Sequence, residues 1–462
     1  MSDVNNFVKV VIRLGGGGVT ATGFGTTMIA GYHTLFTDRV KFYASVSEAE
    51  DEGFDDDHGT LNGLVYDAIV AAFAQSPKPE RVAVGRVQVN QATLLVLNAV
   101  VGRVYTTTVN GVAYTYTAIL GDDVDDVATG LAAAVTAAAA VTAAFTSAGQ
   151  YTVVADVSGT FFSLTCDANQ TMSASGVNED WDDALGAMAD YEDDWYGVTT
   201  TTRDGTAQDL VATWVESAAS PKFYRPASNE ADIVDVVPAS DTTSIAAVLK
   251  AKARLRSSVI YHTKADGTLS DEHIDVAWTV MALGYDPDVE TATDKFKTLS
   301  GITPDKLTTT QRTNAIGTED APTTGKNANV YTTVLGVNVT QSGMTASGEW
   351  NDIVLGADWL KVRIEERIFA MYVRNKKLAY EQDGIEAHLS EIRAQLKIGQ
   401  NTKFLSFDET LDKTFGFLVK GPKRVDVPSA DRVARILKQI SFVATIAGAI
   451  HGAKPINGTL AP

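Results

Sequence analysis

Hydrophobic and polar residues follow two periods along this chain, one typical of helices and one typical of strands. The pattern first predicts a strand beginning at Met28–Gly31, a helix over Gly63–Gln75 and a strand over Arg81–Val87. It resumes after residue 178, with helices predicted over Trp181–Asp194, Ala207–Ser217, Ile245–Leu255 and His273–Ala282, and strands over Val198–Thr201 and Val259–His262. Alternating strands and helices indicate an α/β fold. We therefore expect one middle α/β domain formed by residues 23–92 and 178–345.

Residues 93–177 interrupt this domain and differ from it in composition. They are rich in Thr, Val and Ala, and Arg103 is their single basic residue. Strands at Val104–Val109 and Val112–Ile119 flank Asn110-Gly111, a pair that favours a two-residue hairpin turn. A helix over Ala128–Ala140 and a strand pair around Ser158-Gly159 (Tyr151–Val157 and Phe161–Thr165) would follow. The pattern predicts a small inserted ββαββ domain.

The last third of the chain predicts a further α/β domain, residues 346–440. Its main element is an amphipathic helix over Trp359–Tyr372, with Leu360, Ile364, Ile368 and Met371 spaced as a buried stripe. Before it we expect a polar, turn-rich stretch over Asp286–Gly325 and a strand over Val330–Val339. After it we expect a helix over Asp383–Ile398, a strand pair within Phe415–Val427 and a helix over Ala430–Ile440.

Both ends of the chain carry short strand-like runs. At the N-terminus, residues 4–12 precede the four glycines Gly15–Gly18, which favour a flexible hinge, so residues 1–22 are predicted to form an arm. Ser441–His451 is strand-like as well, and residues 441–462 are predicted to form a second arm. A strand set off by a hinge can add to a sheet edge elsewhere.

Charge is distributed unevenly. The chain of 462 residues has 38 Lys and Arg against 57 Asp and Glu, a net charge of −19, which argues against a nucleic-acid partner. Residues 359–438 hold 16 basic and 11 acidic residues (16 − 11 = +5), so the remainder carries 22 against 46, or −24. The basic block is either chance clustering on a solvated surface or a docking face for an acidic partner.

Two groups of basic residues are predicted to lie on helix faces within this block. Arg363, Arg367 and Arg374 share one face of the Trp359 helix, and Lys361 lies in the same stretch. Arg432, Arg435 and Lys438 would be arranged similarly on the last helix. The alternative is pairing within the chain, with Glu365, Glu366 or Asp431 as the partners.

Motifs for catalysis or for metal and cofactor binding are absent from the sequence. Gly15–Gly18 lacks the Lys-Ser/Thr of a phosphate loop, and the acidic run Glu48–Asp57 with His58 does not match a calcium loop and is expected to be a solvated loop. Asp122–Asp126 precedes a helix, whose dipole it would favour. The six histidines are scattered and Cys166 is the only cysteine. We expect no enzyme activity, cofactor or metal site.

Compartment signals are also few. The first residues lack the basic and apolar regions of a signal peptide, and Ile440–Ile450 is too short to span a bilayer. A lone cysteine cannot form an internal disulfide, which fits assembly in a reducing cytoplasm. We expect no membrane insertion.

Several stretches resemble the tail sheath proteins of contractile phages. They are GFGTTMIAG (Gly23–Gly31), YDAIVAAFAQSPKPERVAVGR (Tyr66–Arg86), FKTLSGITPDKLTTTQ (Phe296–Gln311), NANVYTTVLG (Asn327–Gly336) and GEWNDIVLGADWLKVRIEERIFA (Gly348–Ala370), together with the insertion. The resemblance covers nearly the whole chain in order. It implies a subunit that polymerises as stacked helical rings around a tail tube and contracts to drive the tube through the host envelope.

The resemblance also implies roles for parts of the chain. The C-terminal domain would face the tube through Lys361, Arg363, Arg367, Arg374, Arg432, Arg435 and Lys438. Neighbouring subunits would exchange arm strands through Val8, Val10, Ile12, Phe442, Ala444 and Ile446, and the insertion would project outward. The other partners would be baseplate and tail terminator proteins, in a virion tail assembled in the host cytoplasm.

Two other interpretations stay open from the sequence. A tail tube or other ring-forming virion protein is the second, although the chain length, the two arms and the Trp359 helix weigh against it. A polysaccharide-processing tail component is the third, and it would need a convergent carboxylate pair.

Overall fold

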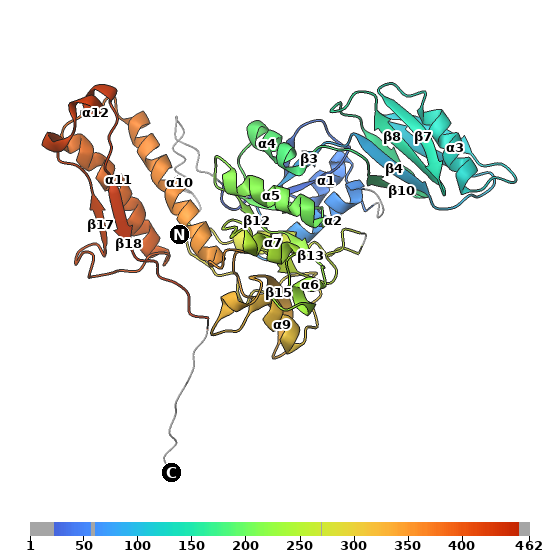
Figure 1. Ribbon diagram of the computed structural model, residues 1–462. Helices are drawn as coiled ribbons and strands as arrows, with labels where there is room; N and C mark the ends of the chain where they lie inside the picture. Colours follow the sequence, from blue (N-terminus) through green and yellow to red (C-terminus); the bar gives the residue numbers. More distant parts are fainter. Residues whose placement is uncertain (1–22, 57–60, 269, 452–462) are drawn as a thin grey trace, which may run out of the picture. The chain divides into compact units, whose positions relative to one another are not determined.

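The computed structural model describes residues 23–56, 61–268 and 270–451. The described chain forms two compact units, a larger one made of residues 23–356 with 449–451 and a smaller one made of residues 357–448 (Figure 1). The predicted N-terminal arm, with Val8, Val10 and Ile12, lies outside the described residues.

A five-stranded sheet forms the centre of the larger unit. Its strands, in the order β12-β11-β1-β3-β2, are β1 (Thr27–Tyr32), β2 (Val40–Tyr43), β3 (Val82–Val87), β11 (Gly197–Thr200) and β12 (Phe223–Tyr224). Strand β1 pairs in parallel with β3, which precedes the insertion, and with β11, which follows it. The two segments separated by the insertion therefore share one sheet, and the mixed α/β architecture expected from the alternating pattern is confirmed.

Helices cover both faces of this sheet because its strands are apolar on both faces. On β1, Ile29 joins a cluster with helices α2 (Leu61–Phe73) and α8 (Ile274–Leu283). Its neighbours Met28 and Ala30 join the opposite cluster, with α4 (Trp181–Tyr191), α5 (Gly205–Ser217) and α7 (Ile245–Ala251). The helices and strands expected here from the sequence are present, with ends shifted by a few residues.

A second sheet has the order β13-β14-β15-β16. Its strands are β13 (Ala227–Ser228), β14 (Ile260–Tyr261), β15 (Asn329–Val334) and β16 (Val337–Gln341), and α6 (Asp232–Asp235), α9 (Thr309–Ile316) and the 3₁₀ helix η2 (Pro322–Thr324) lie nearby in the sequence. The single strand predicted over Val330–Val339 is wrong. The chain turns at Leu335 (φ 49°) and Gly336 (φ 83°), two left-handed residues that suit a tight hairpin.

The insertion contains more strands than the predicted ββαββ pattern. One sheet has the order β10-β4-β8-β7 and the other β6-β5-β9. The elements are β4 (Gln91–Val96), β5 (Val104–Val109), β6 (Val112–Thr117), α3 (Val124–Val135), β7 (Val141–Ser147), β8 (Gln150–Ala155), β9 (Leu164–Cys166) and β10 (Gln170–Ala174). The hairpin at Asn110-Gly111 is confirmed, with both residues left-handed.

Two expectations within the insertion are wrong. The strands on either side of Ser158-Gly159 do not pair with each other, because β8 pairs with β4 and β7 while β9 pairs with β5. Helix α3 ends at Val135, before the predicted Ala140. The Thr136 hydroxyl shares its proton between the carbonyls of Ala132 and Ala143, which ties the helix end to β7. The expected N-terminal acidic residues are confirmed, since Asp123 and Asp126 form a capping box.

The acidic run predicted as a solvated loop contains a helix instead. Helix α1 (Val46–Glu52) begins at Ser45, whose hydroxyl accepts from the Glu48 amide, and the Glu48 carboxylate accepts from the Ala44 amide. It ends at the left-handed Gly53 (φ 107°). The caps at both ends of α1 stabilise the helix against repulsion among its acidic side chains. Ala49 is the buried residue of this helix.

The smaller unit is built on helices α10 (Asn351–Arg374), which begins in the larger unit, and α11 (Gln382–Asn401). It also contains β17 (Phe417–Lys420), the 3₁₀ helix η3 (Arg424–Asp426), α12 (Ser429–Ala434) and β18 (Ser441–Ala444). The predicted α10 and α11 are confirmed, and on α10 Leu360 and Met371 are buried while Ile364 and Ile368 are partly buried.

Two predictions for the smaller unit are wrong. The strand pair within Phe415–Val427 is a single strand, β17, whose partner is β18 from the end of the chain. The helix over Ala430–Ile440 stops at Ala434 because Arg435 has a left-handed backbone (φ 58°).

A buried ionic cluster fastens the start of α8 to the loop after β11. The Arg203 guanidinium donates to Asp271 (Nε to Oδ2, 2.7 Å) and to Asp275 (Nη1 to Oδ2, 2.9 Å). Both carboxylates are inaccessible to solvent. Burial alone would raise the pKa of Asp271, but the guanidinium outweighs burial and holds that pKa well below its usual range. The cluster is stable only while the positive charge is present.

Replacing Arg203 with Met should therefore destabilise the larger unit strongly. Two buried carboxylates would lose their counter-charge, which costs about 3–5 kcal/mol of unfolding free energy. Guanidinium unfolding followed by tryptophan fluorescence measures this loss, with the exposed Lys306→Met as the matched control. The difference from wild type should shrink as the pH falls below about 4, since the low pKa of Asp271 stabilises the fold only above the pKa of an unfolded Asp. An Arg203→Met protein as stable as the control would contradict the assignment.

Candidate interaction surfaces

The arginines of α10 are paired within the chain. Arg363 Nη1 lies 2.8 Å from Glu366 Oε2 on the same helix. Arg367 Nη2 lies 3.0 Å from Glu391 Oε2 on α11, and Arg374 Nη2 lies 3.3 Å from Glu391 Oε1. The two helices are thus joined by one carboxylate between two guanidinium groups. Much of the positive charge expected at a docking face is neutralised locally.

The basic residues near α12 do not share a helix face, so that part of the prediction is wrong. The helix has only six residues, and Arg435 follows it with left-handed backbone. The Arg432 guanidinium donates to the Val427 carbonyl, and Lys438 Nζ lies 2.8 Å from Asp431 Oδ1. Hydrogen bonding to the Asp431 carboxylate raises the pKa of Lys438. The pairing alternative considered for Asp431 is the arrangement that the structure shows.

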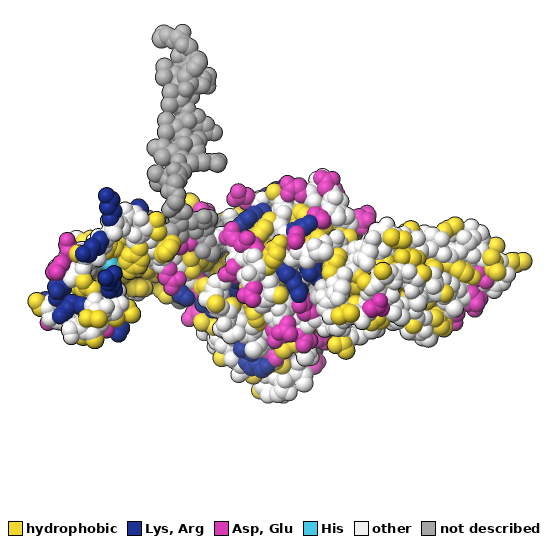
Figure 2. Space-filling model, turned by 90° about the horizontal axis from the view of Figure 1, so that it is seen from above, with side chains coloured by type: hydrophobic (Ala, Val, Ile, Leu, Met, Phe, Trp, Pro, Cys, Tyr) yellow, Lys and Arg dark blue, Asp and Glu magenta, His cyan; other side chains and the backbone are white. Residues whose placement is uncertain are grey.

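One face of α10 combines exposed cations with exposed apolar groups. Lys361 is exposed, and the described residues offer it no ion pair. Further along the helix Phe369, Tyr372 and Val373 each expose half or more of their surface. Figure 2 shows dark blue Lys and Arg side chains among yellow apolar ones on the smaller unit, at the left of that view. Such a mixed surface suits a partner that is both acidic and apolar.

An apolar groove of about 440 Å³ lies between α10 and the end of β18. Its helix wall includes Leu360 and Ile364, and Phe404 and Leu405 form its base. Phe442, Ala444 and Ile446 line the groove from the C-terminal strand, at the two-residue spacing of one strand face. The three C-terminal residues predicted to take part in strand exchange therefore face this groove within their own chain.

The strands beside this groove form an unfinished sheet. Strand β18 pairs with β17 in antiparallel register, with Phe417 opposite Ala444, and no third strand of the described chain joins them. Further along, the Ser406 amide donates to the Thr445 carbonyl (2.8 Å). Phe442 exposes 42% and Val443 52% of its surface, so both faces of β18 present apolar groups to solvent. A two-stranded ribbon is marginally stable by itself, and its open edges can pair with another strand.

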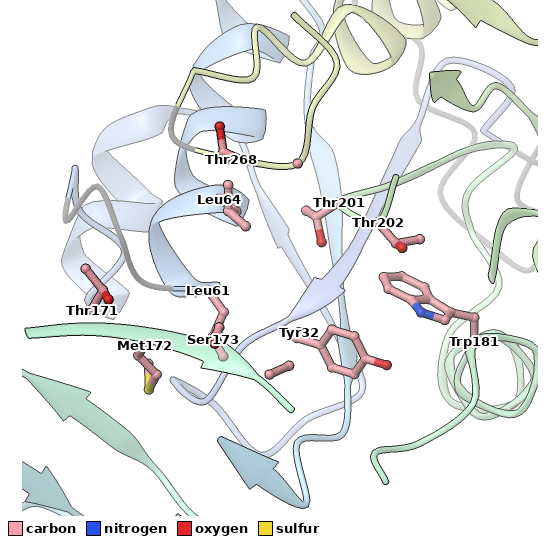
Figure 3. Close-up of a pocket in the computed structure, with 12 residues that line it drawn as sticks. Tyr32, Leu61, Leu64, Thr171, Met172, Ser173, Trp181, Thr201, Thr202 and Thr268 are labelled. Atoms are coloured by element: carbon pink, nitrogen blue, oxygen red, sulfur yellow. The ribbon is translucent and has the colours of Figure 1, made fainter. Parts of the chain in front are cut away.

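A pocket of about 420 Å³ lies in the larger unit, where β10 of the insertion meets α2 and β1 (Figure 3). Tyr32 and Trp181 form one wall, with ring centroids 5.1 Å apart, and Leu61 and Met172 lie opposite. The remaining lining is mostly Thr and Ser. Burial raises the pKa of Tyr32 to about 12, so its hydroxyl stays protonated and cannot serve as a base near neutral pH. The pocket can hold a small uncharged group.

The described part of the chain contains no group of three or more His, Cys, Asp or Glu side chains placed to hold a metal ion. None of its helices is long and apolar enough to cross a membrane.

Comparison with known proteins identifies the fold through structure alone, since no protein-family model and no curated protein sequence matches the chain. The chain is similar to the sheath of the extracellular contractile injection system PVC, in its contracted sheath complex. The two are 10% identical, the match covers 98% of this chain and 97% of that one, and the TM-score is 0.50. The chain has the fold of a contractile sheath protein. A sheath tail protein of Listeria innocua also matches, with 12% identity, 93% and 96% coverage and a TM-score of 0.46.

Within the sheath fold, sequence reasoning missed the residues that complete each surface. Glu391 was not singled out, although it holds two of the predicted tube-facing arginines. Phe404 and Leu405 were missed as the base of the groove. The signal that could have found them is the apolar pair just beyond the end of α11, after the left-handed Lys403, because an apolar residue there often contacts the last turn of the helix.

Replacing Arg435 with Gly separates its backbone role from its charge. Glycine adopts the left-handed conformation freely, so we expect the smaller unit to be stabilised by about 1 kcal/mol. Thermal unfolding by circular dichroism measures the effect. Arg435→Lys keeps the charge and the strain and should leave stability unchanged. An Arg435→Gly protein that is less stable than wild type would show that the side chain, and not the backbone, sets the end of α12.

Proposed function

We propose that this protein is the structural subunit of a contractile sheath and has no catalytic role. The match to a sheath protein along 98% of the chain is the observation that carries the proposal. Copies would polymerise in stacked helical rings around an inner tube, ending at baseplate and terminator proteins. The particle would be a phage tail or a related injection system.

The arms provide the links between copies in this proposal. The β17–β18 ribbon offers open edges, and the groove beside it is apolar. An N-terminal arm from a neighbouring copy would add a strand there, with Val8, Val10 and Ile12 on the face turned to the groove. Backbone hydrogen bonds would supply affinity, and apolar side chains at every second position would fix the register. Phe442, Ala444 and Ile446 would contact the added strand.

Contraction in this proposal needs no nucleotide. Subunits would assemble in a metastable extended array, with favourable contacts between copies not yet made. A trigger at the baseplate would let each subunit rotate as a rigid body and form those contacts, while the arms keep neighbours joined. The energy for driving the tube through an envelope would come from this additional burial of surface.

The tube-facing role is proposed for the exposed part of the basic surface. Lys361, and Arg374 with 65% of its side chain exposed, are the accessible cations of α10. Arg363 and Arg367 are more enclosed and already form ion pairs with carboxylates. They would therefore position the helix and attract an acidic partner more weakly. Arg432, Arg435 and Lys438 would contribute from the segment that follows α11.

Electron microscopy of the purified protein tests the proposal directly. The wild-type chain should form wide, ridged cylinders, whereas a tube protein would form narrow, smooth ones. A chain lacking residues 1–14 should stay folded and fail to build long cylinders. The triple change of Val8, Val10 and Ile12 to Asp should act like the deletion, while the single change Val11→Asp, on the alternate strand face, should assemble more nearly normally. Normal cylinders from the deleted chain would rule out the arm mechanism.

Reversal of one exposed charge tests the docking surface without breaking an ion pair of the described chain. Lys361→Glu should weaken sedimentation of the subunit with purified tubes several-fold at low salt. The difference from wild type should narrow as salt is added, since screening weakens exposed charge pairs. Lys413→Glu, another exposed lysine of the smaller unit, is the control and should bind normally. Equal binding by the two variants would remove Lys361 from the tube interface.

A further inference from the structure

The end of the described chain packs against the larger unit, at a place that the proposed function does not use. Residues 441–448 belong to the smaller unit, whereas residues 449–451 belong to the larger one. There the His451 ring lies edge-on to the ring of Trp350, with centroids 4.7 Å apart and planes at 74°. This is the preferred geometry for two aromatic rings in contact. Trp350 directly precedes α10.

His451 and Trp350 border a cavity of about 540 Å³. Its other walls come from Lys295 and Phe296, from the end of α9, and from the end of β16. Two buried polar atoms at this cavity have no hydrogen-bond partner among the described residues, the Ser342 hydroxyl oxygen and His451 Nε2. Ser342 is only 6% exposed. Buried polar groups are normally paired, so these two atoms indicate that the cavity receives hydrogen-bonding groups.

Burial and a nearby lysine favour the neutral form of His451. Lys295 and Arg312 line it together with Glu319 and Asp320. Burial lowers the pKa of His451, and the positive charge of Lys295 lowers it further. A proton on Nε2 would occupy a buried position without an acceptor. Protonation should therefore weaken the contact between His451 and the cavity.

We propose that this cavity is the docking site of the chain's own C-terminal arm, gripped through neutral His451 and released when the imidazole takes up a proton. Continuity of the chain supports this occupant, since His451 is already seated and residues 452–462 follow directly from it. Those residues contain no acidic side chain, so docking their side chains would bring no further negative charge beside Glu319 and Asp320. The proposal does not depend on the protein being a sheath subunit.

Peptide binding to a shortened chain tests this docking. The protein would end at Gly448, and the probe would be a synthetic peptide of residues 448–462 with an N-terminal fluorophore. Fluorescence anisotropy should show binding to the shortened chain at about pH 7.5, and little binding to the full chain, whose cavity is filled by its own arm. Circular dichroism would first establish that the shortened chain is folded like the full one.

Variants of the peptide isolate His451 without touching the protein. His451→Ala should weaken binding about tenfold, through loss of the ring contact. Ile450→Ala is the matched control, because Ile450 is 92% exposed, and it should bind like the parent peptide. On the protein, Trp350→Ala should abolish the difference between the parent and His451→Ala peptides.

Acidification tests the release. Binding of the parent peptide should weaken several-fold between about pH 7.5 and pH 5.5, because the free imidazole titrates near 6.5 and the bound one is held neutral. His451→Phe keeps a ring on Trp350 and cannot take up a proton, so its binding should not change over this range. Absence of binding to the shortened chain, or equal binding to both chains, would overturn the docking. Equal pH dependence of the parent and His451→Phe peptides would overturn release by protonation.

Discussion

Parallel pairing of β1 with both β3 and β11 is the constraint on which the larger unit depends. These strands come from either side of the insertion, so the sheet closes only if β1 accepts a neighbour on each edge. Close packing of the covering helices requires small residues on the strands. A Cβ added to Gly31 would lie 2.7 Å from Val65 of α2, and one added to Gly197 would lie 2.6 Å from Leu283 of α8. The chain leaves this sheet after β3 to form the insertion and returns to it through α4 and β11, so the two strands that bracket the insertion lie on either side of β1.

Elements with a strong period and clear ends could be predicted from the sequence. The predicted positions of α2, α5, α8 and α11 hold to within a few residues, whereas α10 begins eight residues before its predicted start. The wrong predictions arose where the backbone conformation changes at a residue that the hydrophobic periodicity does not mark. Leu335 and Arg435 adopt left-handed conformations without being Gly, Asn or Asp, so the end of α12 carried no signal and Gly336 alone marked the turn after β15. The pairing of β17 with β18 was missed because the partners are separated by two further segments, η3 and α12.

For the candidate surfaces too, the sequence predicted features set by nearby residues and missed contacts between distant ones. Spacing along α10 placed its arginines on one side of the helix, but it could not show that Glu391 from another helix binds two of them. Counting charges along the sequence therefore overstated the positive field available to a partner. Lys361 is the better candidate, on the ground that its surroundings leave it exposed. Salt bridges at such exposed positions contribute little to stability, which leaves these side chains available for contacts between molecules.

The β17–β18 ribbon adds support to the proposed role, because the described part of the smaller unit leaves this sheet with two strands only. A protein that works alone gains nothing from a two-stranded ribbon with apolar groups on both faces and open edges, because such edges invite association. Edge strands of independent proteins are usually blocked by charge, proline or a bulge, and Ser441–Ala444 has none of these. The exposed Phe442 and Val443 are costly in an isolated chain and favourable only once another strand covers them. The same residues that would make a monomer prone to aggregate are those that the proposed polymer would use at its joints.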